Sequence, residues 1–140
     1  MRIMAIDYGD AHTGIAISDP TGLLAGFTTT ITAYRPEAVA ERVAALAGEH
    51  GAEELVLGHP RNMDGSLGPR AEKAEALADL LRSSTGLPVV LWDERRTTID
   101  AHHILFNAGK NARQRKKTVD AVAASLILEG YLTYKKSQET

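Results

Sequence analysis

Residues 1–19, MRIMAIDYGDAHTGIAISD, decide the fold. Four apolar residues at positions 3–6 run into the carboxylate of Asp7, which predicts a buried strand that ends with an acid at the rim of a sheet. Residues 8–10 then turn the chain, and residues 14–18 return it as the hairpin partner of the first strand. A glycine in this turn lets a phosphate or a metal ion come close to the backbone beside the acid.

Beyond this hairpin the hydrophobic pattern alternates between helix and strand periods. Expected strands cover residues 2–7, 14–18, 23–32, 54–58 and 89–92. Expected helices run from Pro36 to about Gly51, from Pro69 to about Ser83, from Thr97 or Thr98 to about Phe106, and from about Thr118 to Lys135. A polar, glycine-rich loop is expected at 60–68 and a basic loop at 110–117. This order predicts an α/β protein with a mixed sheet flanked by helices, in one domain over residues 1–135 with a frayed tail at 136–140.

Composition excludes several classes of function. The chain has 140 residues, a formal net charge of −2 and no cysteine, so it has no disulfide, thiol nucleophile or cysteine-based zinc site. No apolar run reaches the ~18 residues of a membrane helix, and the first residues lack the pattern of a signal peptide. We therefore expect a cytoplasmic protein without a membrane partner, whose contacts with nucleic acid depend on local basic patches.

Acidic residues stand at the predicted strand ends and at the start of the last helix. Asp7 ends the first strand, Asp93 and Glu94 end the fifth, and Asp120 lies in the first turn of the last helix. Because sites in such sheets gather at the carboxyl ends of the parallel strands, we expect carboxylates from these segments to meet there. Crowded carboxylates repel one another unless a cation lies between them, and oxygen ligands suit Mg²⁺ or Mn²⁺.

Each of these acids also has an ordinary interpretation. A strand-end acid is usually a solvated terminus, and an acid near a helix N-terminus usually stabilises the helix dipole. Adjacent residues of a strand point to opposite faces, so at least one of Asp93 and Glu94 points away from a shared site. The residues alone leave open which of the two it is. The combination of acids, rather than any single one, favours a metal site.

Basic residues lie next to two of these acids. Arg95 and Arg96 follow Glu94, and five cations precede Asp120, namely Lys110, Arg113, Arg115, Lys116 and Lys117. Each group alone is typical of a solvated loop, but cations beside metal-binding acids are what a polyanionic substrate requires. In the loop at 60–68, Arg61 and Asn62 are further candidates for a phosphate contact, although this loop also contains an ordinary turn signal.

Taken together, these segments resemble the YqgF/RuvX family of RNase H-fold proteins, whose members are described as Holliday-junction-resolvase-like and as pre-16S rRNA nucleases. The matching segments, in chain order, are Asp7-Tyr8-Gly9, Gly14 to Asp19, Leu57-Gly58, Asn62 to Gly65 with Gly68, Asp93 to Thr98, Asp120 to Ala124, and Ile127-Leu128. Several motifs in the right order over nearly the whole chain make this match specific, which a lone Asp-x-Gly would not be.

The resemblance implies a five-stranded sheet whose first three strands are antiparallel. It also implies that Asp7, Glu94 and Asp120 are the catalytic, metal-binding carboxylates, and it favours Glu94 over Asp93. The sequence departs from the family pattern at His12, where an arginine is usual, and at His59, where a leucine usually precedes the proline. The first departure removes a permanent cation near the acidic edge, so it concerns the grip on substrate rather than metal binding.

The leading hypothesis is a nuclease dependent on Mg²⁺ or Mn²⁺ that hydrolyses phosphodiester bonds in structured nucleic acid, either precursor rRNA or branched DNA. The metal would activate a water for in-line attack on phosphorus. The predicted substrate-binding residues are Gly9, Arg61, Asn62, Arg95, Arg96, Lys116 and Lys117. Because a four-way junction presents two symmetric cutting positions, a homodimer is one expected form.

Two rival functions fit parts of the sequence. One is a non-catalytic nucleic-acid- or ribosome-binding factor that keeps the fold, with structural acids. The other is a nucleotide phosphotransferase, because Asp-x-Gly before a hairpin also opens the phosphate loop of actin and sugar kinases. The second is disfavoured, because those proteins close a second domain over ATP and this sequence has no Gly-x-x-x-x-Gly-Lys-Ser/Thr segment.

Overall fold

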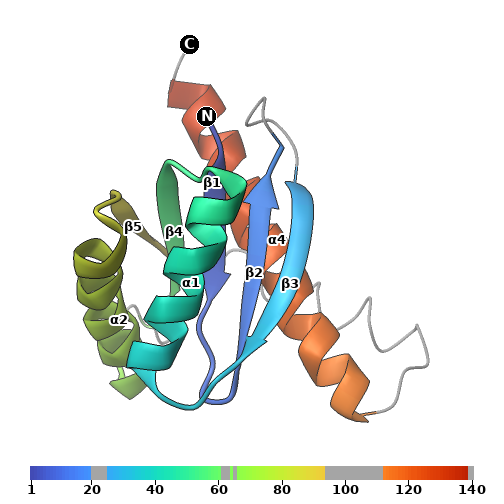
Figure 1. Ribbon diagram of the computed structural model, residues 1–140, viewed down its shortest axis with the longest axis vertical. Helices are drawn as coiled ribbons and strands as arrows, with labels where there is room; N and C mark the ends of the chain where they lie inside the picture. The colour runs from blue at the N-terminus through green and yellow to red at the C-terminus, as the bar shows by residue number, and fades with distance from the viewer. Residues whose placement is uncertain (20–24, 61–63, 65, 94–111, 139–140) are drawn as a thin grey trace.

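The computed structural model describes residues 1–19, 25–60, 64, 66–93 and 112–138. In chain order these residues form β1 (Ile3–Asp7), β2 (His12–Ser18), β3 (Ala25–Thr32), α1 (Pro36–His50), β4 (Glu54–His59), α2 (Pro69–Thr85), β5 (Val89–Asp93) and α4 (Ala112–Gln138) (Figure 1). The predicted order of strands and helices is therefore confirmed over the described residues.

The five strands form one mixed sheet in the order β3-β2-β1-β4-β5. β1 pairs antiparallel with β2 and β2 with β3, whereas β1 pairs parallel with β4 and β4 with β5. The α/β class and the five-stranded sheet with an antiparallel first trio are thus confirmed. β1 is the central strand, and its carboxyl end lies at the same edge of the sheet as the carboxyl ends of β4 and β5.

Helices cover both faces of the sheet, with α1 and α2 on one face and α4 on the other (Figure 1). We call these the α1/α2 face and the α4 face. Side chains of β1 alternate between them: Met4 and Ile6 belong to the core under α1 and α2, whereas Ile3 and Ala5 belong to the core under α4. Burial on both faces explains why β1 reads as a continuous apolar run rather than as an alternating one.

Prolines and glycines set the ends of α1 and α2. Pro36 and Pro69 stand at the first helical positions, where the missing N–H would have no partner within the helix. Gly51 and Gly86 follow the two helices with φ angles of 68° and 70°, the left-handed conformation that glycine adopts without strain. The starts of both helices and the stop at Gly51 match the prediction, and α2 extends two residues further.

The last helix, α4, is longer than the sequence pattern predicts. It begins at Ala112, so the expectation of a basic loop was wrong for residues 112–117. These residues are good helix formers without an interrupting glycine or proline. The helix also continues to Gln138, and the expected helix at 97–106 lies outside the described residues. Although α4 has 27 residues, neither it nor another helix of the described chain is long and apolar enough to cross a membrane.

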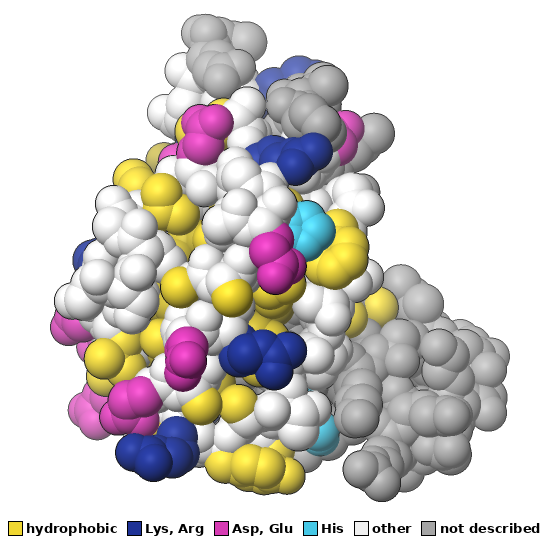
Figure 2. All heavy atoms as spheres, in the orientation of Figure 1, with side chains coloured by type: hydrophobic (Ala, Val, Ile, Leu, Met, Phe, Trp, Pro, Cys, Tyr) yellow, Lys and Arg dark blue, Asp and Glu magenta, His cyan; other side chains and the backbone are white. Residues whose placement is uncertain are grey.

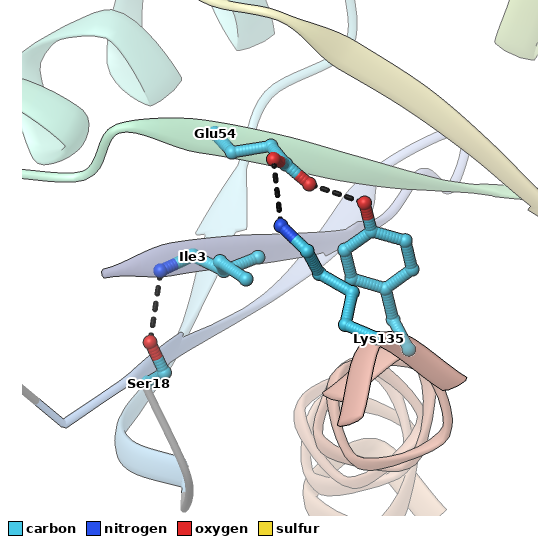
Figure 3. A network of polar contacts seen from close by, with 5 residues as sticks. Ile3, Ser18, Glu54 and Lys135 are labelled. Carbon is cyan, nitrogen blue, oxygen red and sulfur yellow. Dashed lines mark hydrogen bonds and ion pairs between the residues drawn. The ribbon is translucent and has the colours of Figure 1, made fainter. Parts of the chain in front are cut away.

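A polar network fastens the C-terminal turns of α4 at the edge of the sheet where β1 and β4 begin (Figure 3). The hydroxyl of Tyr131 donates a hydrogen bond to the Glu54 carboxylate, and the Nζ atom of Lys135 lies 3.2 Å from the other carboxylate oxygen. Nearby, the backbone N–H of Ile3 donates to Ser18 Oγ at 2.8 Å. Burial, together with the hydrogen bond to Glu54, raises the pKa of Tyr131. This network therefore lies at the edge of the sheet opposite to the one where Asp7 and Asp93 end their strands.

Candidate active site

Asp7 is the last residue of the central strand and is half-buried. Ile3 and Ala5, four and two positions earlier, both pack on the α4 face. Because side chains alternate along a strand, the Asp7 carboxylate lies on that face too, at the carboxyl edge of the sheet. Its backbone is paired with Gly14 of β2, so a rigid element holds this acid.

Asp93 ends β5 at the same edge of the sheet, but on the other face. Leu91 packs against the core under α1 and α2, whereas Trp92 belongs to the core under α4. By the same alternation, Asp93 follows Leu91 to the α1/α2 face. Asp93 therefore does not share a face with Asp7. Glu94, the other acid that the sequence left open, lies outside the described residues.

The neighbour of Asp93 on β4 supports this assignment of faces. His59 is the register partner of Asp93 and is only 3% exposed. Its Nε2 atom lies 3.1 Å from Oε1 of Glu75, which belongs to α2. A histidine that reaches α2 must point to the α1/α2 face, and its cross-strand partner points the same way. Sequence reasoning missed this pair, because an isolated histidine after an apolar strand carries no signal for a carboxylate 16 positions later.

Asp120 lies within α4, the helix that covers the Asp7 face. Its backbone stands one helical turn before Ala124, which is fully buried in the same core cluster as Ala5. The side chain of Asp120 is outside the described residues. The backbone thus brings the helix that carries position 120 to the correct face of the sheet.

Gly9, which follows Asp7 by two positions, has a steric reason to be glycine. A Cβ atom at this position would overlap the backbone carbonyl oxygen of His12 across the turn. The glycine therefore permits a close approach of backbone to backbone, and its predicted role in phosphate binding stays a prediction. His12, the departure from the family pattern, places Nδ1 3.3 Å from Thr32 Oγ1 on β3.

The other predicted substrate-binding residues fall at the margins of the described chain. Lys116 and Lys117 lie in the N-terminal part of α4, where the backbone is helical and the side chains are not described. Arg61, Asn62, Arg95 and Arg96 lie outside the described residues.

The described part of the site fits a hard divalent cation. Asp7 presents carboxylate oxygens from a rigid strand, and such oxygens are the ligands that Mg²⁺ and Mn²⁺ prefer. Within the described residues, no three or more His, Asp or Glu side chains are grouped so as to hold a metal ion. A metal site at Asp7 would therefore need further carboxylates from side chains that the structure does not describe, and Glu94 and Asp120 stay the predicted ones.

A mixed sheet in this order, with helices on both faces and a C-terminal helix across the face of Asp7, is the arrangement of the RNase H-like class of folds. A solved structure of this class, "T. thermophilus RuvC in complex with Holliday junction substrate", aligns with a TM-score of 0.61 over 97% of this chain and 96% of that chain. The two sequences are only 14% identical, so this similarity concerns the fold.

The chain belongs to the RuvX family, whose model, described as "RuvX: Holliday junction resolvase", matches residues 1–134. A relative from Halothermothrix orenii, named "Putative pre-16S rRNA nuclease", is 46% identical over 134 residues, and the match covers 96% of this chain and 96% of the relative. A relative of the same name from Listeria monocytogenes is 44% identical over 134 residues, with 94% of this chain and 97% of the relative covered. The chain is thus a member of a nuclease family, as the sequence motifs predict.

Proposed function

We propose that this nuclease uses Mg²⁺ or Mn²⁺ to hydrolyse phosphodiester bonds in structured nucleic acid, with precursor 16S rRNA or branched DNA as its substrate. The observation that carries the proposal is the placement of Asp7 on a rigid strand end, on the face covered by α4. The names of the curated relatives support an rRNA substrate, and the RuvC structure, which was solved with a Holliday junction, supports branched DNA.

Asp7, Glu94 and Asp120 are the residues that would hold the metal. Asp7 comes from the central strand, Glu94 follows β5 directly, and Asp120 comes from the helix that covers the Asp7 face. The face of Asp93 favours Glu94 over Asp93 for this role, because Asp93 lies on the face of the sheet opposite to Asp7. When bound, the metal supplies Lewis-acid stabilisation of phosphate oxygens and a more acidic attacking water.

The remaining residues of the site would hold and orient the nucleic-acid backbone. Position 116 lies one helical turn before position 120, so Lys116 would place a cation next to the acidic edge. Lys117, Arg95, Arg96, Arg61 and Asn62 would add further contacts with phosphates. Such contacts position a polyanion without reading its sequence, which suits a substrate recognised by its shape.

Cleavage assays on two substrates test the proposal. A precursor rRNA fragment and a four-way DNA junction are each incubated with the protein in Mg²⁺, in Mn²⁺ and in EDTA. We expect cleavage of at least one substrate with either metal and none in EDTA. Binding of RNA without cleavage under every condition would instead identify the protein as a non-catalytic binding factor and contradict the proposal.

A further inference from the structure

A concave site lies on the α1/α2 face, beside the turn after β1 and on the face opposite to the Asp7 carboxylate. It is a cavity of about 630 Å³, within the range that small-molecule sites occupy. The turn after β1 contributes Tyr8 and Asp10, the segment before α1 contributes Tyr34, and α2 contributes Lys73 and Asp79. Figure 2 shows this face of the molecule, with acidic, basic and hydrophobic side chains side by side over the lower parts of α1 and α2.

Two tyrosine rings give the cavity aromatic walls. Tyr8 is half-buried against the core under α1 and α2, whereas Tyr34 is 77% exposed. An aromatic ring attracts a cation placed over its face, and acidic groups near the ring strengthen that attraction. Pro36, Ala76 and Leu80 complete an apolar lining beside the rings.

The charged groups of the lining are mainly acidic. Asp10, Glu37 and Asp79 face one cation, Lys73, whose Nζ lies 3.5 Å from Asp10 Oδ1. Glu37 and Asp79 also have arginine neighbours, Arg35 at 3.8 Å and Arg82 at 3.0 Å, but neither arginine lines the cavity.

The described lining holds three carboxylates and one ammonium group, so its formal charge is −2. All side chains of the three ion pairs are substantially exposed, and because exposed pairs are weak, a ligand cation can replace a paired one. Burial, and then the carboxylates of Asp10 and Glu37, raise the pKa of Tyr8. Because the described lining has more carboxylates than cations, the cavity disfavours a phosphate.

We propose that this cavity binds an organic cation, an alkylammonium or guanidinium group on an apolar stem. The carboxylates and the tyrosine rings would take the cationic head, and Pro36, Ala76 and Leu80 would contact the stem. The head belongs either to a free polyamine or to a basic side chain of another protein. This site is separate from the proposed nuclease site, because it lies on the other face of the sheet.

Calorimetric titration of the full chain, without nucleic acid or divalent metal, tests the proposal with two probes: spermidine and a short arginine-rich peptide. We expect one of them to bind with one site per chain. Saturation by spermidine alone would assign the free polyamine, and saturation by the peptide alone would assign a basic side chain. Absence of binding by both probes would overturn the proposal.

Three variants test whether the cavity is the binding site. Glu37→Gln combined with Asp79→Asn should weaken binding about tenfold. Tyr34→Ala should weaken it about two- to fivefold. Glu41→Gln is the matched control, because it removes the same charge one turn further along α1 on an exposed residue outside the lining. Weakening by Glu41→Gln as large as that by the double variant would show unspecific attraction to an acidic surface and refute the site.

Discussion

Asp7 and Asp93 end two strands at the same edge of one sheet, yet they belong to opposite faces. Asp7 lies on the face that α4 covers, whereas Asp93 lies beside the buried His59, which contacts Glu75 of α2. Both acids follow a buried apolar run, so the sequence presents them as equivalent. Whether a strand-end acid can contribute to a site therefore depends on the face of the sheet to which its side chain points. Alternation along the strand decides that face.

The largest effect is expected from exchanging these two acids for their amides. Asp7→Asn should reduce cleavage about 10²-fold or more, because it removes a charged ligand of the proposed metal site. Asp93→Asn should keep cleavage within about threefold of the wild type, because its side chain lies on the other face of the sheet. Initial rates with Mg²⁺ measure both effects, and circular dichroism checks that both variants fold. An equal loss in the two variants would remove the distinction between the faces.

A second prediction concerns the turn that follows Asp7. Gly9→Ala should destabilise the protein by about 1–3 kcal/mol, because the new Cβ overlaps the His12 carbonyl oxygen and the backbone must shift. Urea denaturation measures the change. Gly48→Ala is the matched control, since a Cβ there meets no atom within 4 Å in α1, and it should stabilise by about 0.5–1 kcal/mol. If Gly9→Ala also stabilised the protein, the steric reason for this glycine would be wrong.

A change in the polar network around Glu54 should have a smaller effect. Tyr131→Phe removes a hydrogen bond to the Glu54 carboxylate and should cost about 1.5 kcal/mol of unfolding free energy. The cost stays moderate because Lys135 still pairs with Glu54 at 3.2 Å. Cleavage at saturating substrate should be unchanged, since this network lies at the edge opposite to Asp7. A loss of cleavage without a loss of stability would place Tyr131 in the nuclease site instead.

The same tyrosine predicts a dependence on alkaline pH. Burial and the hydrogen bond to Glu54 raise the pKa of Tyr131 above its ordinary value near 10, so above that pH the folded chain keeps a proton that the unfolded chain loses. This contribution to stability is therefore complete below pH ~10 and declines as the pH rises further. In denaturation series at increasing alkaline pH, wild type should lose stability faster than Tyr131→Phe. Parallel curves would contradict the assignment.

The smallest effect is expected at the cation of the α1/α2 cavity. Lys73→Gln should change stability by less than about 0.5 kcal/mol, because its pair with Asp10 is exposed. The same change should tighten binding of the organic cation about two- to fivefold, since it removes the positive charge of the lining. Thermal denaturation and calorimetry measure the two values. Weaker binding of the organic cation in this variant would contradict the role given to charge in this cavity.

The sequence predicted the fold well, but the site only in part. The order of strands and helices along the chain followed from the apolar run at 3–6 and the helix punctuation at Pro36 and Gly51. The five-stranded sheet with its antiparallel first trio followed from the resemblance to the family. The face of Asp93 could not be predicted, because shifting a strand end by one residue reverses every side chain. The cavity could not be predicted from the sequence either, because Tyr8, Tyr34 and Asp79 come together only through packing of segments far apart in the chain.

A crystal of the protein soaked in Mn²⁺ and measured for anomalous diffraction tests directly whether Asp7 anchors the metal site. We expect a peak on the α4 face, in contact with the Asp7 carboxylate and shared with Glu94 and Asp120. The same crystal shows Asp93 on the other face, so the two acids serve as each other's control. A peak bound by Asp93, or full occupancy elsewhere with no metal at Asp7, would contradict the assignment of Asp7 to the nuclease site.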